Sequence, residues 1–295
     1  MQKNKTIINS EETLETMTIQ VEASTASEAE ISDAGEYFRS MKKSKAIRTP
    51  SEIIAEEPDG DDYLIKGILK PEKKLLLVAP PKAGKTNLAV NLALGIASGT
   101  DILDFKCKQG NVLYVDCETG LRDVVERLYH IAEQRGIDKT ICDNIKFYDP
   151  YINYRINASD LLREISEQIE YGEYKLVVID SFYCVFDGDE NSSKDVSLFV
   201  RYVDEFIEKT GSAVLIIHHE GKKTNYKKSV VDRACGSNVF GRFFDGIISL
   251  SHNENNDSSE GISETIEMCL RAFRPQEPIN VVFKDCLHSR EKEVI

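Results

Sequence analysis

The chain has 295 residues, a hydrophobic content of 41% and a formal net charge of −13. This length allows one large domain with a full core, and the negative charge argues against a basic coat that binds nucleic acid over the whole surface. Its seven cysteines contain no CxxC pair, and no apolar run approaches the about 20 residues of a membrane span. We therefore expect a cytoplasmic protein with no disulfide framework and no membrane partner.

The first sixty residues differ in composition from the rest, because they are rich in Ser, Thr and Glu. Such a segment has too little apolar surface to form a core, so the sequence predicts a disordered, acidic and polar tail over residues 1–60. A basic stretch, MKKSKAIR at 41–48, and a candidate short helix around 34–43 leave docking of partner proteins as an alternative. The folded domain is expected to span residues 61–290.

From Tyr63 onward, apolar strand-like runs alternate with helical stretches. This alternation is typical of an α/β fold with a mostly parallel central sheet and flanking crossover helices. The last two strands, 264–273 and 279–283, follow each other closely and are expected to form an antiparallel pair. The other predicted strands are 75–78, 111–119, 175–181, 212–222 and 245–250, and the predicted helices are 86–98, 121–136 and 158–172.

The stretch VAPPKAGKTN, residues 78–87, nearly matches the phosphate-loop pattern GxxxxGK[ST] between a strand and a helix. That pattern turns backbone N–H groups toward phosphate oxygens and adds a lysine charge at a helix N-terminus. Ala79 stands where the pattern has its first glycine, but the glycine, lysine and hydroxyl that carry the chemistry are present. The residues expected to bind nucleotide are Ala79, Pro80, Pro81, Lys82, Ala83, Gly84, Lys85, Thr86 and Asn87.

An aspartate, Asp180, ends the apolar strand KLVVIDS. In a phosphate-loop enzyme this is the position of the carboxylate that holds the water shell of Mg²⁺ beside the loop hydroxyl, here that of Thr86. The sequence therefore predicts a magnesium site formed by Thr86 and Asp180.

A second carboxylate is expected at the end of the strand VLYVDCE, where Glu118 could polarise an attacking water. Asp116 is the alternative, because strand alternation would place both acids on the same side of the sheet. Two adjacent histidines, His218 and His219, end a further buried strand. One of them could donate a hydrogen bond to the γ-phosphate and act as a sensor, and the spacing does not choose between them.

The ordered set PPKAGKT, YVDCE, LVVIDS, LIIHHEGK, RACGSNVFGRFFDGIISL and LRAFRPQEP resembles the RepA-type replicative helicases of plasmids and phages. These are RecA-like AAA ATPases related to the hexameric DnaB-like helicases. The resemblance covers residue 63 to about residue 283. It departs from the family at Ala79 and at Arg242, where relatives often have a small residue.

The resemblance implies a RecA-like core that binds ATP and Mg²⁺, assembles into a hexameric ring and acts on DNA. It assigns Lys85, Thr86 and Asp180 to triphosphate and metal, and Glu118 to the catalytic base. It also implies an arginine finger supplied by the neighbouring subunit, with Arg271 and Arg274 as candidates and Arg233 in reserve.

A basic loop, GKKTNYKKS at 221–229, combines positive charge with one aromatic ring and contains no acid. That mixture suits single-stranded DNA, and in a RecA-like ring the loop would face the centre. A regulatory or loading ATPase that binds replication proteins, through the N-terminal tail for example, is the alternative to a helicase. The candidate DNA-binding residues are Lys222, Lys223, Tyr226, Lys227 and Lys228.

Overall fold

The computed structural model describes residues 47, 49–52, 62–150, 158–220, 229–230, 239–258 and 261–291. The chain divides into two units, Met1–Gly60 and Asp61–Ile295, and the sheet and its helices belong to the second. Most of the expected tail, the candidate helix at 34–43, the basic loop 221–228 and Arg233 lie outside the described residues. No helix in the described part of the chain is long and apolar enough to span a membrane.

A nine-stranded sheet, in the order β3-β2-β4-β5-β1-β6-β7-β8-β9, runs through the described part of the second unit. The first six strands in this order, from β3 through β2, β4, β5 and β1 to β6, pair in parallel with their neighbours. The remaining pairs, β6 with β7, β7 with β8 and β8 with β9, are antiparallel. The predicted α/β fold and the C-terminal antiparallel pair are thus confirmed. The strands are β1 Lys74–Ala79, β2 Val112–Asp116, β3 Ile145–Tyr148, β4 Leu176–Asp180, β5 Ala213–His219, β6 Gly246–Ser258, β7 Gly261–Leu270, β8 Ile279–Lys284 and β9 Leu287–Arg290.

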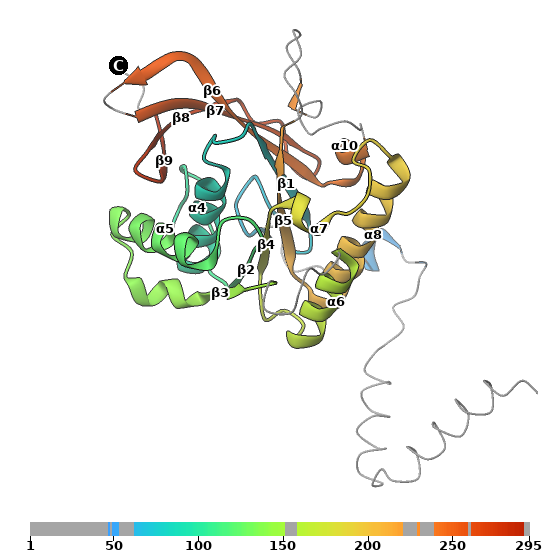
Figure 1. The fold of residues 1–295 in the computed structure, drawn as a ribbon. Helices are drawn as coiled ribbons and strands as arrows, with labels where there is room; N and C mark the ends of the chain where they lie inside the picture. The colour runs from blue at the N-terminus through green and yellow to red at the C-terminus, as the bar shows by residue number, and fades with distance from the viewer. Residues whose placement is uncertain are drawn as a thin grey trace, which may run out of the picture. The chain divides into compact units, whose positions relative to one another are not determined.

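Helices cover both faces of the sheet, which is why the parallel strands are buried on both sides (Figure 1). One core contains side chains of α4 and α5, and the other contains side chains of α6, α8 and α10. Helix α4 is buried without a break from Leu88 to Ala97, as its apolar sequence predicts. The helices are α4 Lys85–Ser98, α5 Leu121–Gln134, η1 Lys139–Asn144, α6 Ala158–Gln168, α7 Phe182–Val185, α8 Ser193–Thr210 and α10 Val239–Phe243.

Six of the described elements were not predicted from the sequence: β3, η1, α7, α8, α10 and β9. Strand β3 has four residues, IKFY, with burial on one end only, so it carries almost no alternation to recognise. Strand β9 includes a buried histidine, and a polar side chain weakens the apolar pattern of an already short strand. Helix α8 has buried positions at helical spacing and could have been predicted.

Candidate functional site

The phosphate loop connects the end of β1 to the start of α4, as predicted. Ala79 is the last residue of β1, where it is fully buried and does not have positive φ. The left-handed conformations come later in the loop, at Lys82 with φ 66° and at Gly84 with φ 68°. Because the backbone at Ala79 is an ordinary strand, the missing first glycine does not prevent the loop from forming.

Gly84 is required both by its conformation and by its surroundings. A Cβ atom at this residue would lie 3.2 Å from Cε1 of His288 and 3.5 Å from Cε2 of Phe283. Its left-handed φ also suits glycine best. The C-terminal hairpin of β8 and β9 therefore packs directly against the start of α4, a contact that the sequence did not predict.

Lys85 is buried in the loop, with 7% of its surface exposed. Its Nζ donates a hydrogen bond of 3.0 Å to the carbonyl oxygen of Pro80. Burial lowers the pKa of Lys85, while the charges of Glu118 and Asp180 oppose that shift. The first N–H groups of α4 and this ammonium group are donors of the kind that bind anions.

Asp180 ends β4 and is 1% exposed. Burial raises the pKa of its carboxyl to about 6, against the effect of hydrogen bonds with Thr86 and Tyr114. The bond from Tyr114 Oη to Asp180 Oδ2 is 2.8 Å long. A buried carboxylate beside a hydroxyl is a donor set that fits Mg²⁺, because the ion relieves the cost of burying the negative charge.

The two acids expected at the end of β2 differ in burial and in their hydrogen-bond partners. Asp116 ends the strand, is buried, and accepts hydrogen bonds from the backbone N–H groups of Glu118, Thr119 and Gly120 at 3.3, 3.0 and 2.6 Å. Glu118 follows the strand and has a side chain that is 48% exposed. Asp116 thus shapes the loop, and Glu118 is the acid that lines the cavity.

The two histidines lie on opposite faces of β5. His218 is fully buried among aromatic rings, with its centroid 4.6 Å from that of Phe182 and 5.0 Å from that of Phe240. Burial lowers the pKa of His218 to about 4. His219 instead lines the phosphate-loop cavity, with Nε2 3.5 Å from Oε2 of Glu118. Burial and the charge of Lys85 lower the pKa of His219.

The two candidate finger arginines also differ. The Arg271 guanidinium donates to the carbonyl oxygens of Gly241, at 2.9 Å, and Arg242. Arg274 is exposed, and its guanidinium has no hydrogen bond or ion pair with any other described residue. The guanidinium of Arg271 therefore binds the end of α10 within this chain. That of Arg274 is exposed and could contact a second molecule.

A cavity of about 580 Å³ is lined by residues of the phosphate loop together with Glu118, Asp180 and His219, whereas Asp116, His218, Arg271 and Arg274 do not line it. It also includes three residues that the sequence analysis missed, namely Arg127 of α5, Phe283 of β8 and Cys286 of the following turn. Arg127 precedes Leu128, one of the buried residues of α5. Its positive charge was the only feature of the sequence that could have indicated a place in the site. The lining residues are Pro81, Lys82, Gly84, Lys85, Thr86, Asn87, Glu118, Arg127, Asp180, His219, Phe283 and Cys286.

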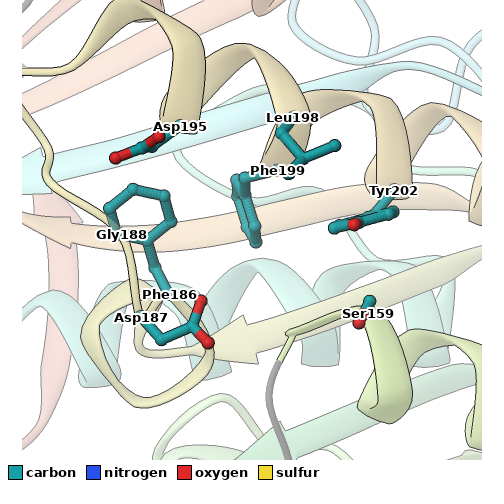
Figure 2. Close-up of a pocket in the computed structure, with 8 residues that line it drawn as sticks. All are labelled: Ser159, Phe186, Asp187, Gly188, Asp195, Leu198, Phe199 and Tyr202. Carbon is teal, nitrogen blue, oxygen red and sulfur yellow. The ribbon is translucent and has the colours of Figure 1, made fainter.

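A second cavity, of about 430 Å³, lies along α8 and is unsuited to a triphosphate (Figure 2). Its rings come from Phe186, Phe199 and Tyr202, and its polar edge carries the carboxylates of Asp187 and Asp195. With two acids and no Lys or Arg among its described lining residues, this cavity would repel phosphate. The lining that suits a triphosphate is therefore that of the cavity beside α4.

A phosphate loop ahead of α4, acids at the ends of β2 and β4, and a mostly parallel sheet define a RecA-like P-loop ATPase fold. A family model described as an AAA domain matches residues 42–225, so the chain belongs to this AAA-domain family. The RadB recombinase structure matches with a TM-score of 0.54 and 18% identity, over 75% of this chain and 92% of that one. A second solved structure, described as an ATPase domain, matches with a TM-score of 0.57 and 14% identity, over 75% of this chain and 85% of that one.

Proposed function

We propose that the protein is an ATP-hydrolysing RecA-like motor, specifically a RepA-type replicative helicase or DNA translocase of a plasmid, phage or integrated mobile element. The observation that carries the proposal is the gathering of Lys85, Thr86, Glu118, Asp180 and His219 around one cavity at the carboxyl ends of parallel strands. A cation, a hydroxyl, a buried acid, an exposed acid and an imidazole are the groups that triphosphate hydrolysis requires.

Binding would rest on the loop and the ends of β1 and β4. Lys85 and the N–H groups at the start of α4 would contact the β- and γ-phosphates. Thr86 and Asp180 would hold Mg²⁺, which when bound supplies positive charge to the phosphate oxygens. Asp180 would then be ionised, because a cation beside a buried carboxyl favours its charged form.

Hydrolysis would depend on Glu118, whose half-exposed side chain lines the cavity. Asp116 is the weaker candidate, because its carboxylate already accepts three backbone hydrogen bonds. Glu118 would orient and polarise the attacking water. His219, close to Glu118, would donate to the γ-phosphate and respond to its loss. His218 faces an aromatic core on the other side of the sheet and is the weaker candidate.

The test of this chemistry is a pair of variants assayed for binding and turnover. Lys85→Ala should abolish hydrolysis and weaken ATP binding, since it removes the phosphate cation. Glu118→Gln should keep ATP binding and lose at least about 100-fold in kcat, the lower range for a catalytic base. Near-normal turnover in Glu118→Gln with tight ATP binding would overturn its role and move the base to Asp116.

The motor part of the proposal includes a hexameric ring that binds single-stranded DNA. It is supported by the sequence resemblance and by the exposed position of Arg274, which suits a finger offered to a neighbouring subunit. The test is the ATPase rate with and without single-stranded DNA, alongside a mass measurement in the presence of ATP. A monomer whose ATPase ignores DNA would overturn the motor assignment and leave the ATPase assignment intact.

The alternative is a nucleotide-gated regulator or loader that binds replication proteins without unwinding DNA. The net charge of −13 favours it, because most of the surface would repel a nucleic acid. Strand displacement on a forked DNA substrate separates the two, since only a helicase separates the strands.

A further inference from the structure

The residues that line the cavity beside α4 are of two chemical kinds. Most are charged or polar, and they account for a triphosphate and its ion. Phe283 and Cys286, contributed by the C-terminal hairpin, are not. A phosphate has no surface that an aromatic ring would bind, so the ring suits a different part of a ligand.

The Phe283 ring is stacked on the imidazole of His288. The ring centroids are 4.6 Å apart with the planes at 26°, and the two residues are cross-strand partners of β8 and β9. Phe283 is half-buried and lines the cavity. An aromatic face at the edge of a cavity is a surface on which a planar base can stack.

The hairpin that carries Phe283 is anchored from several sides. His288 is buried, and its Nε2 lies 3.0 Å from Oε2 of the buried Glu264. The turn between the strands is held by Asn91 Nδ2, which donates to the carbonyl of Cys286 at 3.3 Å, and by Gln134 Nε2, which donates to that of Asp285 at 2.8 Å. The ring is therefore presented in one place relative to α4.

Two further observations place a nucleoside rather than another apolar group here. The Phe283 ring lies against Gly84, the residue that caps α4 and that directly precedes the phosphate-binding lysine. Asn87, in the first turn of α4, also lines the cavity, and its Oδ1 is buried without a hydrogen-bond partner among the described residues. An unpaired buried acceptor calls for a donor, which the amino group of a base or a ribose hydroxyl can supply.

We propose that Phe283 forms the base subsite of the site, stacking against the aromatic base of a nucleoside triphosphate while His288 backs the ring. This inference rests on the proposed nucleotide binding and extends it to the nucleoside part of the ligand. Stacking alone accepts any base, so Phe283 would supply affinity for the nucleoside and Asn87 the preference among nucleosides.

The chain has no tryptophan, so Phe283→Trp introduces a single fluorescent reporter at the subsite. With Mg²⁺ present, ATP and ADP should quench this tryptophan, whereas inorganic tripolyphosphate, which has no base, should bind without quenching it. Phe186→Trp, in the cavity along α8, is the matched control and should respond to none of the three. No quenching by ATP at concentrations that saturate binding by calorimetry would overturn the inference.

Phe283→Leu tests the energetics, because it keeps an apolar side chain and removes the flat face. The ATP dissociation constant should rise by about 5- to 100-fold, the range for removing one base–aromatic stack, while that of tripolyphosphate stays within about twofold. Phe186→Leu should change neither. An equal loss of affinity for both ligands would overturn the inference by making Phe283 a packing residue, and unchanged affinity for both would place the base elsewhere.

The same titrations distinguish a failure of the base subsite from a failure of the proposed nucleotide binding. If neither ATP nor tripolyphosphate binds the wild-type chain, and Lys85→Ala makes no difference, both the nucleotide site and the base subsite are wrong. If wild-type protein binds ATP and Lys85→Ala does not, the nucleotide site stands and only the response of the Phe283 variants decides the subsite.

Discussion

The hydroxyl of Tyr114 donates a hydrogen bond of 2.8 Å to Oδ2 of Asp180, and both side chains are 1% exposed. The two residues lie on the neighbouring parallel strands β2 and β4. Burial raises the pKa of Tyr114 well above its usual value, so the phenol keeps its proton and donates at every physiological pH. Tyr114 is thus a positioning residue for the carboxylate expected to hold Mg²⁺.

Tyr114→Phe should shift the acid limb of the ATPase pH profile upward. The hydrogen bond that it removes is one of the two that lower the pKa of Asp180, so the carboxyl of the variant stays protonated to a higher pH. One hydrogen bond to a charged group corresponds to a shift of about one pH unit. The measurement is kcat against pH at saturating ATP and fixed Mg²⁺, and superimposable profiles for variant and wild type would contradict the idea.

Asp180→Asn should stabilise the protein at pH 7.5 in the absence of Mg²⁺ and nucleotide. Because burial raises the folded pKa from 3.8 to about 6, the stabilisation from the protonated form is complete below pH 3.8 and lost as the pH rises through about 6. The asparagine avoids the buried charge, so the free energy of unfolding in urea should increase by about 1–3 kcal/mol.

The same comparison made at pH 4.5 is the control for Asp180→Asn. There the wild-type carboxyl is largely protonated, so the gain in stability should shrink. A gain of equal size at both pH values would show that the effect does not come from ionisation of Asp180.

His219→Gln should lower kcat by about tenfold or more while leaving the ATP dissociation constant nearly unchanged. The side chain lies at the cavity beside Glu118, so its removal should affect the transition state more than ground-state binding. His218→Gln is the matched comparison, and it should lower the melting temperature because it places an amide in an aromatic core. A larger loss of kcat in a well-folded His218→Gln would reverse the assignment.

Mixing Lys85→Ala subunits with Arg274→Ala subunits should restore part of the ATPase activity that each lacks alone. In a mixed assembly, some interfaces pair an intact pocket with an intact arginine, and a finger in trans is worth about 10³–10⁵ in rate. Arg271→Ala should instead reduce stability, because its guanidinium binds carbonyls at the end of α10. A stable monomer that hydrolyses ATP as fast as the assembled protein would refute the trans finger.

Replacing Lys222, Lys223, Lys227 and Lys228 by alanine should weaken binding to single-stranded DNA and reduce its salt dependence. The log–log slope should fall by about 0.7 for each phosphate that a lysine no longer neutralises, and ATP hydrolysis without DNA should barely change. The check is the dissociation constant of a fluorescent oligonucleotide across a salt series. Wild-type affinity with an unchanged slope would remove this loop from the DNA path and favour the regulatory alternative.

The sequence by itself determined the elements whose signal is local. A strand of four apolar residues, a GKT triplet and an apolar helix in direct succession predicted the phosphate loop around Lys85. The acids and histidines were found because each lies at or just after the end of a buried strand, and parallel strands bring their carboxyl ends to one edge of the sheet. Short elements such as β3 were missed, because four residues with one buried end carry too little periodicity.

Only the tertiary structure decided between side chains that the sequence treats alike. Asp116 and Glu118 differ in environment because β2 ends at Asp116 and the chain turns before it reaches Glu118. His218 and His219 differ in environment because successive residues of a strand face opposite sides of the sheet. Only the packing of the helices shows which side holds the cavity. Phe283 and His288 reach Gly84 across about 200 residues of chain, a contact set by the order of β8 and β9 in the sheet. Local pattern carries no information about such distant contacts, because they form when whole elements pack together.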